Sequence, residues 1–391
     1  MEENKVEQSN SVSQIVVESL NELGSTLIAF IKAPKALWGI NIPYVIEGLV
    51  YFGVLTILGK FCSENVGLSD LHAGWVYSFF TAGITFAMLF LGGVSDKIGV
   101  PRALALAFFM FIVGRGLISF SGSISLGQGA SSPMFFIMAA GLLITLIAYG
   151  LYQPAAYAGV KRYTNPKTAA MGYAVVYGLM NLGAFFSGFV SPAIRHRFVD
   201  VFPPNGLTAV FWTYTGLCVI ALLVSLAILT RKTDRNAIER IAAETLELES
   251  VGDDTSEEKQ KAIEPPPRAP IPTSAKIKFG VLAALSVFAV AISIMSTIDV
   301  LDIQPLDTYV LSLCLIAWTV YEFLRVRPDH PFLNSRFTFF IFMLIPVQTL
   351  FAHNWLTLPY YLDRAFRGSV VSDYFEFFSN INPILIFVPV S

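Results

Sequence analysis

The sequence predicts an all-α protein that crosses a membrane several times. Of its 391 residues, 54% are hydrophobic and only 14% are charged, whereas an ordinary soluble domain carries about 25% charged residues. The mean hydropathy is +0.62, and many apolar stretches reach the roughly 20 residues that a helix needs to span a bilayer. The formal net charge of −2 gives no electrostatic indication of nucleic-acid binding.

The predicted elements follow one another in an ordered series. Residues 14–37 mix apolar and charged residues at helical spacing and predict an amphipathic helix on the membrane surface, after a start without signal-peptide features. Residues 231–277 are rich in charge and proline and predict a cytoplasmic linker. The expected spans are 42–61, 72–94, 102–121, 133–158, 168–193 and 208–230 before the linker, and 278–298, 308–324, 337–361 and 375–391 after it.

Basic residues in the short loops predict the orientation. Lys97 and Arg102 follow the second span, Lys161 and Arg162 follow the fourth, and the linker after the sixth is strongly basic, while the alternate loops are poorer in Lys and Arg. The positive-inside rule therefore predicts a cytoplasmic N-terminus in a plasma membrane, the inner membrane of a bacterium. The last apolar segment stops at Ser391 without a polar flank, which predicts that this is the front portion of a longer protein.

A glycine-rich loop, GGVSDKIGVPR, stands between the second and third spans. It resembles the cytoplasmic loop signature of the major facilitator superfamily, G-x-x-x-D-[RK]-x-G followed by basic residues. Glycines allow a tight turn, and a carboxylate is stabilised near a helix N-terminus. We therefore expect a cytoplasmic gate formed by Gly92, Asp96, Lys97 and Arg102; the alternative is an ordinary basic loop with a capping aspartate.

A narrower resemblance is carried by several segments in order. IEGLVYFG in the first span resembles the E-x-x-E-R-F-x-Y-Y-G motif of the proton-coupled oligopeptide transporters, with Glu47, Tyr51 and Gly53 on matching positions. GLYQP, VYGLMNLGAF and SNINPILI resemble segments of that family's fourth, fifth and eighth spans. The implied fold is a major facilitator fold with a complete N-terminal six-helix bundle, a two-helix insertion and the first part of the C-terminal bundle.

This resemblance implies a division of the chain into five parts. They are a tail with the surface helix (1–38), the N-terminal bundle (39–230), the linker (231–277), an additional helical hairpin (278–325) and the first two helices of an incomplete C-terminal bundle (336–391). The chain departs from the family at charged positions of the coupling machinery. Tyr44 replaces the motif's first Glu, Gly48 its Arg, and Gln153 the Lys of the fourth span, while Gln348 stands where relatives are acidic. The implied proton coupling is weakened accordingly.

Polar side chains form stripes on the predicted spans. Tyr44, Glu47 and Tyr51 lie at i, i+3 and i+7 and share one face of the first span. Stripes of this kind face a water-filled cavity or another helix rather than lipid. The residues expected to line a substrate cavity are Tyr44, Tyr51, Tyr149, Gln153, Tyr177, Asn181 and Gln348. The alternative for each of them is hydrogen bonding between helices.

Ionisable residues within the spans are candidates for proton coupling. We expect Glu47 to carry the proton or contact the substrate, with a buried structural ion pair or a capping role as the alternative. His353 could share the proton, or be a structural hydrogen-bonding residue. Arg115, in the third span, is expected to snorkel or to find a partner near the outer face rather than to bind substrate.

These features together predict a secondary transporter. We find no P-loop, no nucleophile motif and no metal-like spacing of His or Cys, so we expect no enzyme, no cofactor and no metal site. The prediction is proton-coupled uptake of small peptides or related small polar solutes by alternating access. The partners are then the solute, protons and the lipid bilayer. Two alternatives stay open: an uncoupled facilitator or exporter of a non-peptide solute, and a non-transporting permease-like receptor. The substrate, the direction of transport and the oligomeric state stay undetermined.

Overall fold

The fold is known from a computed structural model that describes residues 33–166, 168–251, 272–297, 301–327 and 331–383. Within these ranges the regular secondary structure is helical and contains no strand. Eight of the described helices are long and apolar enough to cross a membrane, as the composition predicts. The surface helix expected at 14–37 lies almost wholly outside the described residues.

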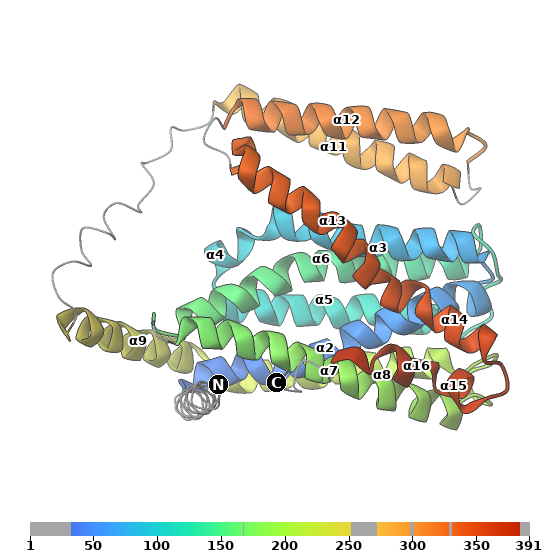
Figure 1. The fold of residues 1–391 in the computed structure, drawn as a ribbon, viewed down its shortest axis with the longest axis horizontal. Helices are drawn as coiled ribbons and strands as arrows, with labels where there is room; N and C mark the ends of the chain where they lie inside the picture. Colours follow the sequence, from blue (N-terminus) through green and yellow to red (C-terminus); the bar gives the residue numbers. More distant parts are fainter. Residues whose placement is uncertain (1–32, 167, 252–271, 298–300, 328–330, 384–391) are drawn as a thin grey trace, which may run out of the picture.

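Six long helices pack into a first bundle (Figure 1). They are α2 (Lys35–Lys60), α3 (Asp70–Leu91), α5 (Val100–Ser121), α6 (Pro133–Arg162), α7 (Ala169–Arg197) and α8 (Leu207–Ile228). The first helix begins earlier than the expected residue 42 and continues beyond its end as a π-helical turn, η1 (Phe61–Asn65). The short helix α4 (Val94–Ile98) follows α3 and ends at Gly99, whose φ of +84° is accessible mainly to glycine.

Polar residues set where several helices begin. The hydroxyl oxygen of Ser69 accepts a hydrogen bond from the backbone N–H of His72 at the start of α3. Ser132 does the same for the N–H of Phe135 at the start of α6, where Pro133 occupies the first helical position. Each bond satisfies an N–H group that has no partner inside its own helix.

The centre of the first bundle is α2, which packs against α7 and α8, while α5 packs against α6 and α8. Two glycines let α2 and α7 approach closely. A Cβ atom at Gly48 would lie 2.6 Å from the carbonyl oxygen of Met180, and one at Gly183 would overlap the carbonyl oxygen of Val45. The two backbones therefore touch where these glycines face each other.

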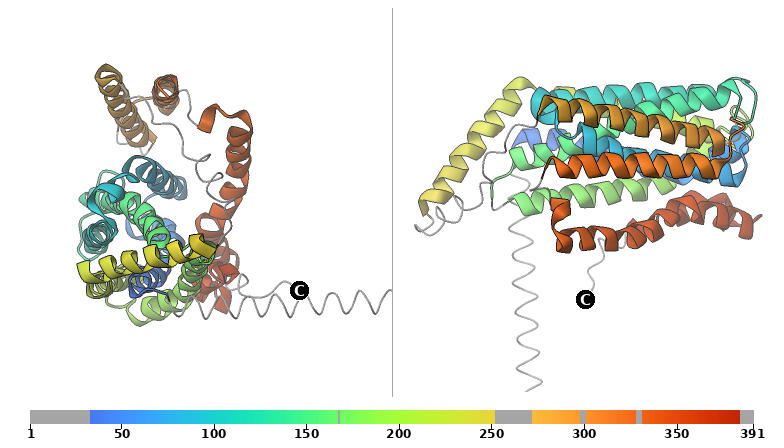
Figure 2. Two further views of the ribbon diagram at one scale, coloured as in Figure 1. Left: turned by 90° about the vertical axis from the view of Figure 1, so that its left-hand side faces the viewer. Right: turned by 90° about the horizontal axis from the view of Figure 1, so that it is seen from above.

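A linker helix and a hairpin follow the first bundle. The linker helix α9 (Arg231–Val251) is held to the end of α6 by a hydrogen bond of 2.7 Å from the Tyr163 hydroxyl to Asp234 Oδ1. The hairpin of α11 (Thr273–Thr297) and α12 (Pro305–Arg325) runs alongside the bundle (Figure 2). Hydroxyl pairs such as Ser286 with Thr319 join its two helices, at 2.9 Å in this case.

The C-terminal segment crosses the first bundle obliquely and reaches its far end (Figure 1). It consists of η2 (Pro331–Leu333), α13 (Ser335–Leu356), α14 (Leu358–Ala365), α15 (Val370–Asp373) and α16 (Phe375–Ser379). The span expected at 337–361 is divided into two helices at Thr357. Of the span expected at 375–391, only α16 falls within a described helix, and residues 384–391 lie outside the described part.

Candidate functional site

The two intramembrane charges, Glu47 and Arg115, meet inside the first bundle. Arg115 NH1 donates to Glu47 Oε2 at 2.8 Å, and NH2 donates to Glu47 Oε1 at 2.5 Å. The Tyr149 hydroxyl also donates to Glu47 Oε1. The side chain of Glu47 is 3% exposed and that of Arg115 is 1% exposed. Arg115 therefore does not snorkel, because its guanidinium turns inward to a buried carboxylate, which is the partner that the sequence did not name.

Other groups complete the surroundings of this pair. Arg115 NH1 lies 2.7 Å from Cys218 Sγ on α8, and its guanidinium carbon lies 4.4 Å from the ring centre of Phe111. Arg115 Nε has no hydrogen-bond partner among the described residues. The ion pair thus joins α2 to α5, with contacts from α6 and α8, and this is the alternative that the sequence left open for Glu47.

Four of the expected cavity residues, on α2 and α6, contact one another in two pairs. Tyr44 is buried and donates from its hydroxyl to Gln153 Oε1 at 2.8 Å, which joins α2 to α6. Tyr51 packs edge-on against Tyr149, with ring centres 5.1 Å apart. These contacts therefore pair the expected residues of α2 with those of α6. Their role in a substrate cavity stays a prediction.

The expected residues on α7 and α13 lie apart from that cluster. Tyr177 is 55% exposed, and its carbonyl oxygen accepts a 2.9 Å hydrogen bond from Asn181 Nδ2. On α13, the His353 ring nitrogen Nδ1 lies 2.6 Å from the Thr357 hydroxyl. Gln348 also falls on α13, but its side chain lies outside what the structure describes.

We call the end of the bundle where α2 begins the proximal end, and the end where α2 terminates the distal end. The expected gate loop lies at the proximal end. Asp96 and Lys97 on α4 are exposed, as is Arg102 at the start of α5. Within the described residues none of these three side chains forms a hydrogen bond or ion pair. On α13, side chains toward the same end are also exposed, such as Phe340 at 68% and Phe342 at 64%.

At the distal end, by contrast, the C-terminal segment is bound to the first bundle by charges. Lys60 Nζ lies 2.5 Å from Asp363 Oδ2, and Arg364 forms a two-pronged pair with Asp70 at 2.5 and 2.9 Å. The Tyr360 hydroxyl lies 3.0 Å from that of Ser63. These contacts join α2, η1 and α3 to α14.

A second set of distal contacts is centred on α16. Arg195 Nε on α7 donates to Glu376 Oε1 at 2.6 Å, and the Glu376 side chain is fully buried. The ring of Phe375 lies between two cations, 4.9 Å from Lys60 Nζ and 5.1 Å from the guanidinium carbon of Arg195. Asn380 Nδ2 donates to the Thr56 hydroxyl on α2 at 2.9 Å. None of these distal residues is among the site residues expected from the sequence.

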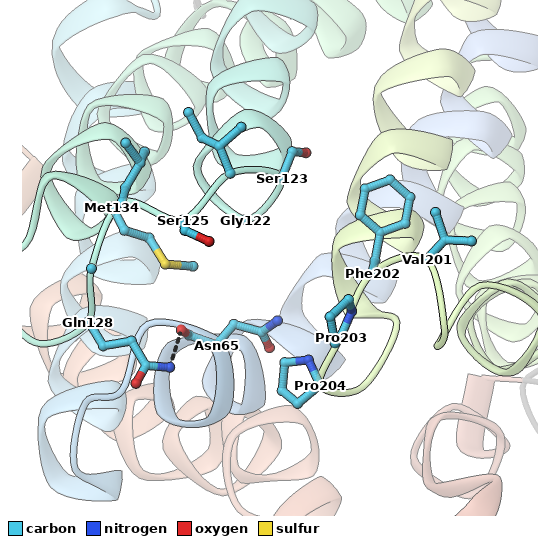
Figure 3. Close-up of a pocket in the computed structure, with 13 residues that line it drawn as sticks. Asn65, Gly122, Ser123, Ser125, Gln128, Met134, Val201, Phe202, Pro203 and Pro204 are labelled. Carbon is cyan, nitrogen blue, oxygen red and sulfur yellow. Dashed lines mark hydrogen bonds between the residues drawn. The ribbon is translucent and has the colours of Figure 1, made fainter.

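A pocket of about 350 Å³ also opens at the distal end, between the α5–α6 and α7–α8 loops (Figure 3). Its labelled polar residues include Asn65, Ser123 and Gln128, and Gln128 Nε2 donates to the Asn65 carbonyl oxygen at 3.2 Å. None of the expected site residues lines it. Among the described residues, no group of three His, Cys, Asp or Glu side chains could hold a metal ion.

The sequence places one carboxylate and one guanidinium inside apolar spans, but their similar depth becomes visible only with the helix starts of the structure. Glu47 lies 12 residues after the start of α2 at Lys35, or about 18 Å at 1.5 Å per residue. Arg115 lies 15 residues after the start of α5 at Val100, or about 22 Å. Both helices start at the proximal end, so the two charges lie at similar depth. Opposite charges at one depth inside apolar spans are expected to pair.

Comparison with known proteins finds distant relatives among peptide permeases. Dipeptide and tripeptide permease A from Klebsiella pneumoniae is 23% identical over 171 residues, which are 43% of this chain and 32% of that protein. The permease of the same name from Escherichia coli is also 23% identical, with the same coverage. The chain thus spans about a third of the length of the curated relatives it matches.

Solved structures with a similar fold include a POT family transporter in complex with 5-aminolevulinic acid. That structure has a TM-score of 0.60 and 19% identity, over 91% of this chain and 68% of that one. A peptide transporter POT in complex with sulfate gives a TM-score of 0.59 and 18% identity, over 91% and 66% of the two chains. At such identities the likeness establishes the fold. The model of the Major Facilitator Superfamily matches residues 41–362, which is most of the sequence, and the chain therefore belongs to this superfamily, with the fold of the POT peptide transporters.

Proposed function

We propose that the chain belongs to a secondary transporter that moves short peptides or related small polar solutes by alternating access. The observation that carries this proposal is the asymmetry of contact between the first bundle and the C-terminal segment. The two are bound through ion pairs at the distal end, whereas the gate residues Asp96, Lys97 and Arg102 are exposed at the proximal end and form no ion pair among the described residues. Two parts that separate at one end and close at the other are what alternating access requires.

The orientation assigns these ends to the two sides of the membrane. The basic loops of the sequence favour a cytoplasmic proximal end, so the distal contacts would close the protein toward the outside of a plasma membrane. In this arrangement solute would exchange with the cytoplasm. When the distal contacts break, we propose that Asp96, Lys97 and Arg102 find partners and close the proximal end.

The side chains expected to line the substrate cavity suit a polar solute. Tyr44 and Gln153 supply a hydroxyl and an amide, and Tyr177 and Asn181 supply the same two kinds of group from α7. Such groups hydrogen-bond to peptide carbonyl and N–H groups. The named activity of the permease relatives, which is carriage of dipeptides and tripeptides, supports peptides as the first solutes to test.

Proton coupling is a separate component of the proposal. Its candidate carriers are Glu47 and His353. A second candidate function, an uncoupled facilitator or exporter, is favoured by one observation: Glu47 already has a cationic partner in Arg115 and is shielded from solvent. A permease-like receptor would bind solute without moving it.

Uptake of radiolabelled dialanine into proteoliposomes that contain the full-length protein tests the proposal. Accumulation driven by an inward proton gradient indicates a coupled carrier, and equal uptake with and without the gradient indicates a facilitator. Binding without uptake indicates a receptor. The test variant is Gln153→Ala, which removes the amide acceptor of Tyr44 and is expected to weaken uptake about 5-fold, because a lost hydrogen bond costs about 1 kcal/mol. Absence of both binding and uptake of dialanine would contradict a peptide substrate.

A further inference from the structure

We propose that Glu47 and Arg115 form a permanent, electrically neutral tie within the first bundle, and that Glu47 takes up no proton during transport. The ion pair is inferred independently of the proposed transport function, and only the claim that Glu47 takes up no proton during transport rests on that function. The inference assigns Arg115 a role in holding the bundle together and removes Glu47 from the coupling candidates.

Three hydrogen-bond donors reach the two oxygens of the carboxylate. Its Oε2 accepts from Arg115 NH1, and its Oε1 accepts from both Arg115 NH2 and the Tyr149 hydroxyl. A guanidinium that meets a carboxylate with two parallel hydrogen bonds is among the strongest ion-pair geometries in proteins. A proton on the carboxylate would remove the negative charge that holds the guanidinium.

The surroundings of the pair exclude both solvent and competing charges. Glu47 and Arg115 are 2% and 1% exposed, and Tyr149 and Cys218 are 1% and 0% exposed. The other ionisable groups that face the pair are phenols and a thiol: Tyr44 and Tyr51 on α2, Tyr149 and Tyr152 on α6, and Tyr214 and Cys218 on α8. These groups are neutral at physiological pH. The opposing face of α7 presents Gly183 and Met180, which do not ionise.

The packing of α2 explains why the cation comes from α5. The position next to Glu47 is Gly48, where even a Cβ atom would lie 2.6 Å from the Met180 carbonyl oxygen. An arginine at that position would force α7 away from α2. Arg115 supplies the charge from the opposite side, and the guanidinium packs on the Phe111 ring at 4.4 Å. The carboxylate is thereby neutralised without opening the contact between α2 and α7.

The tie has a thermodynamic signature that a proton carrier lacks. Removal of one member of a buried ion pair leaves an uncompensated charge and shifts a folding equilibrium by about 10²- to 10³-fold. Removal of both members restores neutrality. We therefore expect Glu47→Gln and Arg115→Met each to lose stability by this factor, and the double variant to recover most of the loss.

The chain provides its own matched control. Asp70 and Arg364 form an equally short ion pair whose side chains are 51% and 48% exposed. Exposed ion pairs contribute little to the free energy of unfolding. Asp70→Asn and Arg364→Met should therefore each shift the folding equilibrium by less than about 5-fold. If the Glu47 and Arg115 variants lose no more stability than this control, or if the double variant recovers nothing, the tie does not exist.

Two further measurements test the absence of a proton on Glu47. First, the stability difference between the parent protein and the double variant should be the same at pH 7.5 and pH 5. A parent that gains stability relative to the double variant at pH 5 would mean that the folded protein binds a proton at Glu47, because a group that binds more protons in the folded state stabilises the fold as the pH falls. Second, the folded double variant should show the same ratio of dialanine uptake with and without a proton gradient as the parent. Loss of gradient-driven accumulation would overturn the proposal. If the parent carries no dialanine, the proposed function fails, while the two stability measurements still decide the tie.

Discussion

Replacement of Arg195 by glutamine should open the distal end of the protein. Arg195 donates to both oxygens of Glu376, at 2.6 and 3.2 Å, and to the carbonyl oxygen of Asp373 at 2.6 Å. The Glu376 side chain is 0% exposed and that of Arg195 is 15% exposed. Without the guanidinium the carboxylate would stay buried and uncompensated, which costs about 3–5 kcal/mol. Since each 1.4 kcal/mol is a factor of ten, the lower value already favours opening by about 100-fold.

The pair of Asp70 and Arg364 serves as the comparison within the same interface. Its side chains are about half exposed, and exposed pairs contribute about 1 kcal/mol at most. Asp70→Asn should therefore favour opening by less than about 5-fold.

Distances between spin labels measure the opening directly. Labels at Ser125→Cys and Arg367→Cys would report on the α5–α6 loop and on the segment between α14 and α15, both exposed at the distal end. The exposed Cys314 is replaced by serine, while Cys62 and Cys218 are buried. Arg195→Gln should move most of the population to longer distances, and Asp70→Asn should change it little. If the two variants changed the distances equally, or in the reverse order, burial would not determine the strength of this interface.

The remaining predictions concern helix packing, the linker helix and pH. Gly183→Ala should lower the melting temperature in detergent, because overpacking costs about 1–3 kcal/mol of stability. Gly74 has open space around it, so Gly74→Ala should leave the melting temperature unchanged. Equal losses in the two variants would contradict the close contact of α2 and α7. Tyr163→Phe removes the hydrogen bond to Asp234, which should weaken the docking of α9 by about 1 kcal/mol and speed hydrogen exchange in α9. Unchanged exchange would show that this bond does not hold α9 in place. Hydrogen bonds from Arg364 hold the pKa of Asp70 below its ordinary value, against a smaller effect of burial. A lowered pKa means that the pair contributes to distal closure above about pH 4 and loses that contribution as the pH falls further. The pair should therefore contribute equally at pH 7 and pH 5, and a change in spin-label distances between them that Asp70→Asn abolishes would refute this assignment.

Local pattern was sufficient to predict much of the fold. Long apolar runs predicted the helices, because an α-helix in a bilayer satisfies its own backbone and needs only apolar side chains. The glycine-rich loop and IEGLVYFG predicted the superfamily, which the match over residues 41–362 confirms. Helix limits were less accurate: α2 begins at Lys35 rather than near 42, since a polar residue at a membrane boundary does not end a helix.

The candidate site was predicted only in part. The helical period correctly placed Tyr44, Glu47 and Tyr51 on one helix, but it did not reveal which group each of them meets. Tyr44 meets Gln153 and Tyr51 meets Tyr149, both on α6. Arg115 was expected to snorkel or to find a partner near the outer face, and the sequence did not name that partner. Its partner lies 68 residues away in sequence, and a single helix contains no information about such a neighbour.

The sequence alone therefore determined that this is a helical membrane protein of the major facilitator type, with a carboxylate and a guanidinium inside apolar spans. Only the tertiary structure decided that these two charges neutralise each other and that the C-terminal segment is bound at the distal end through Lys60, Arg195 and Arg364. The physical reason is the range of the interactions. Hydropathy and helical period are properties of neighbouring residues, whereas a buried ion pair or a closed end depends on how helices distant in sequence cross.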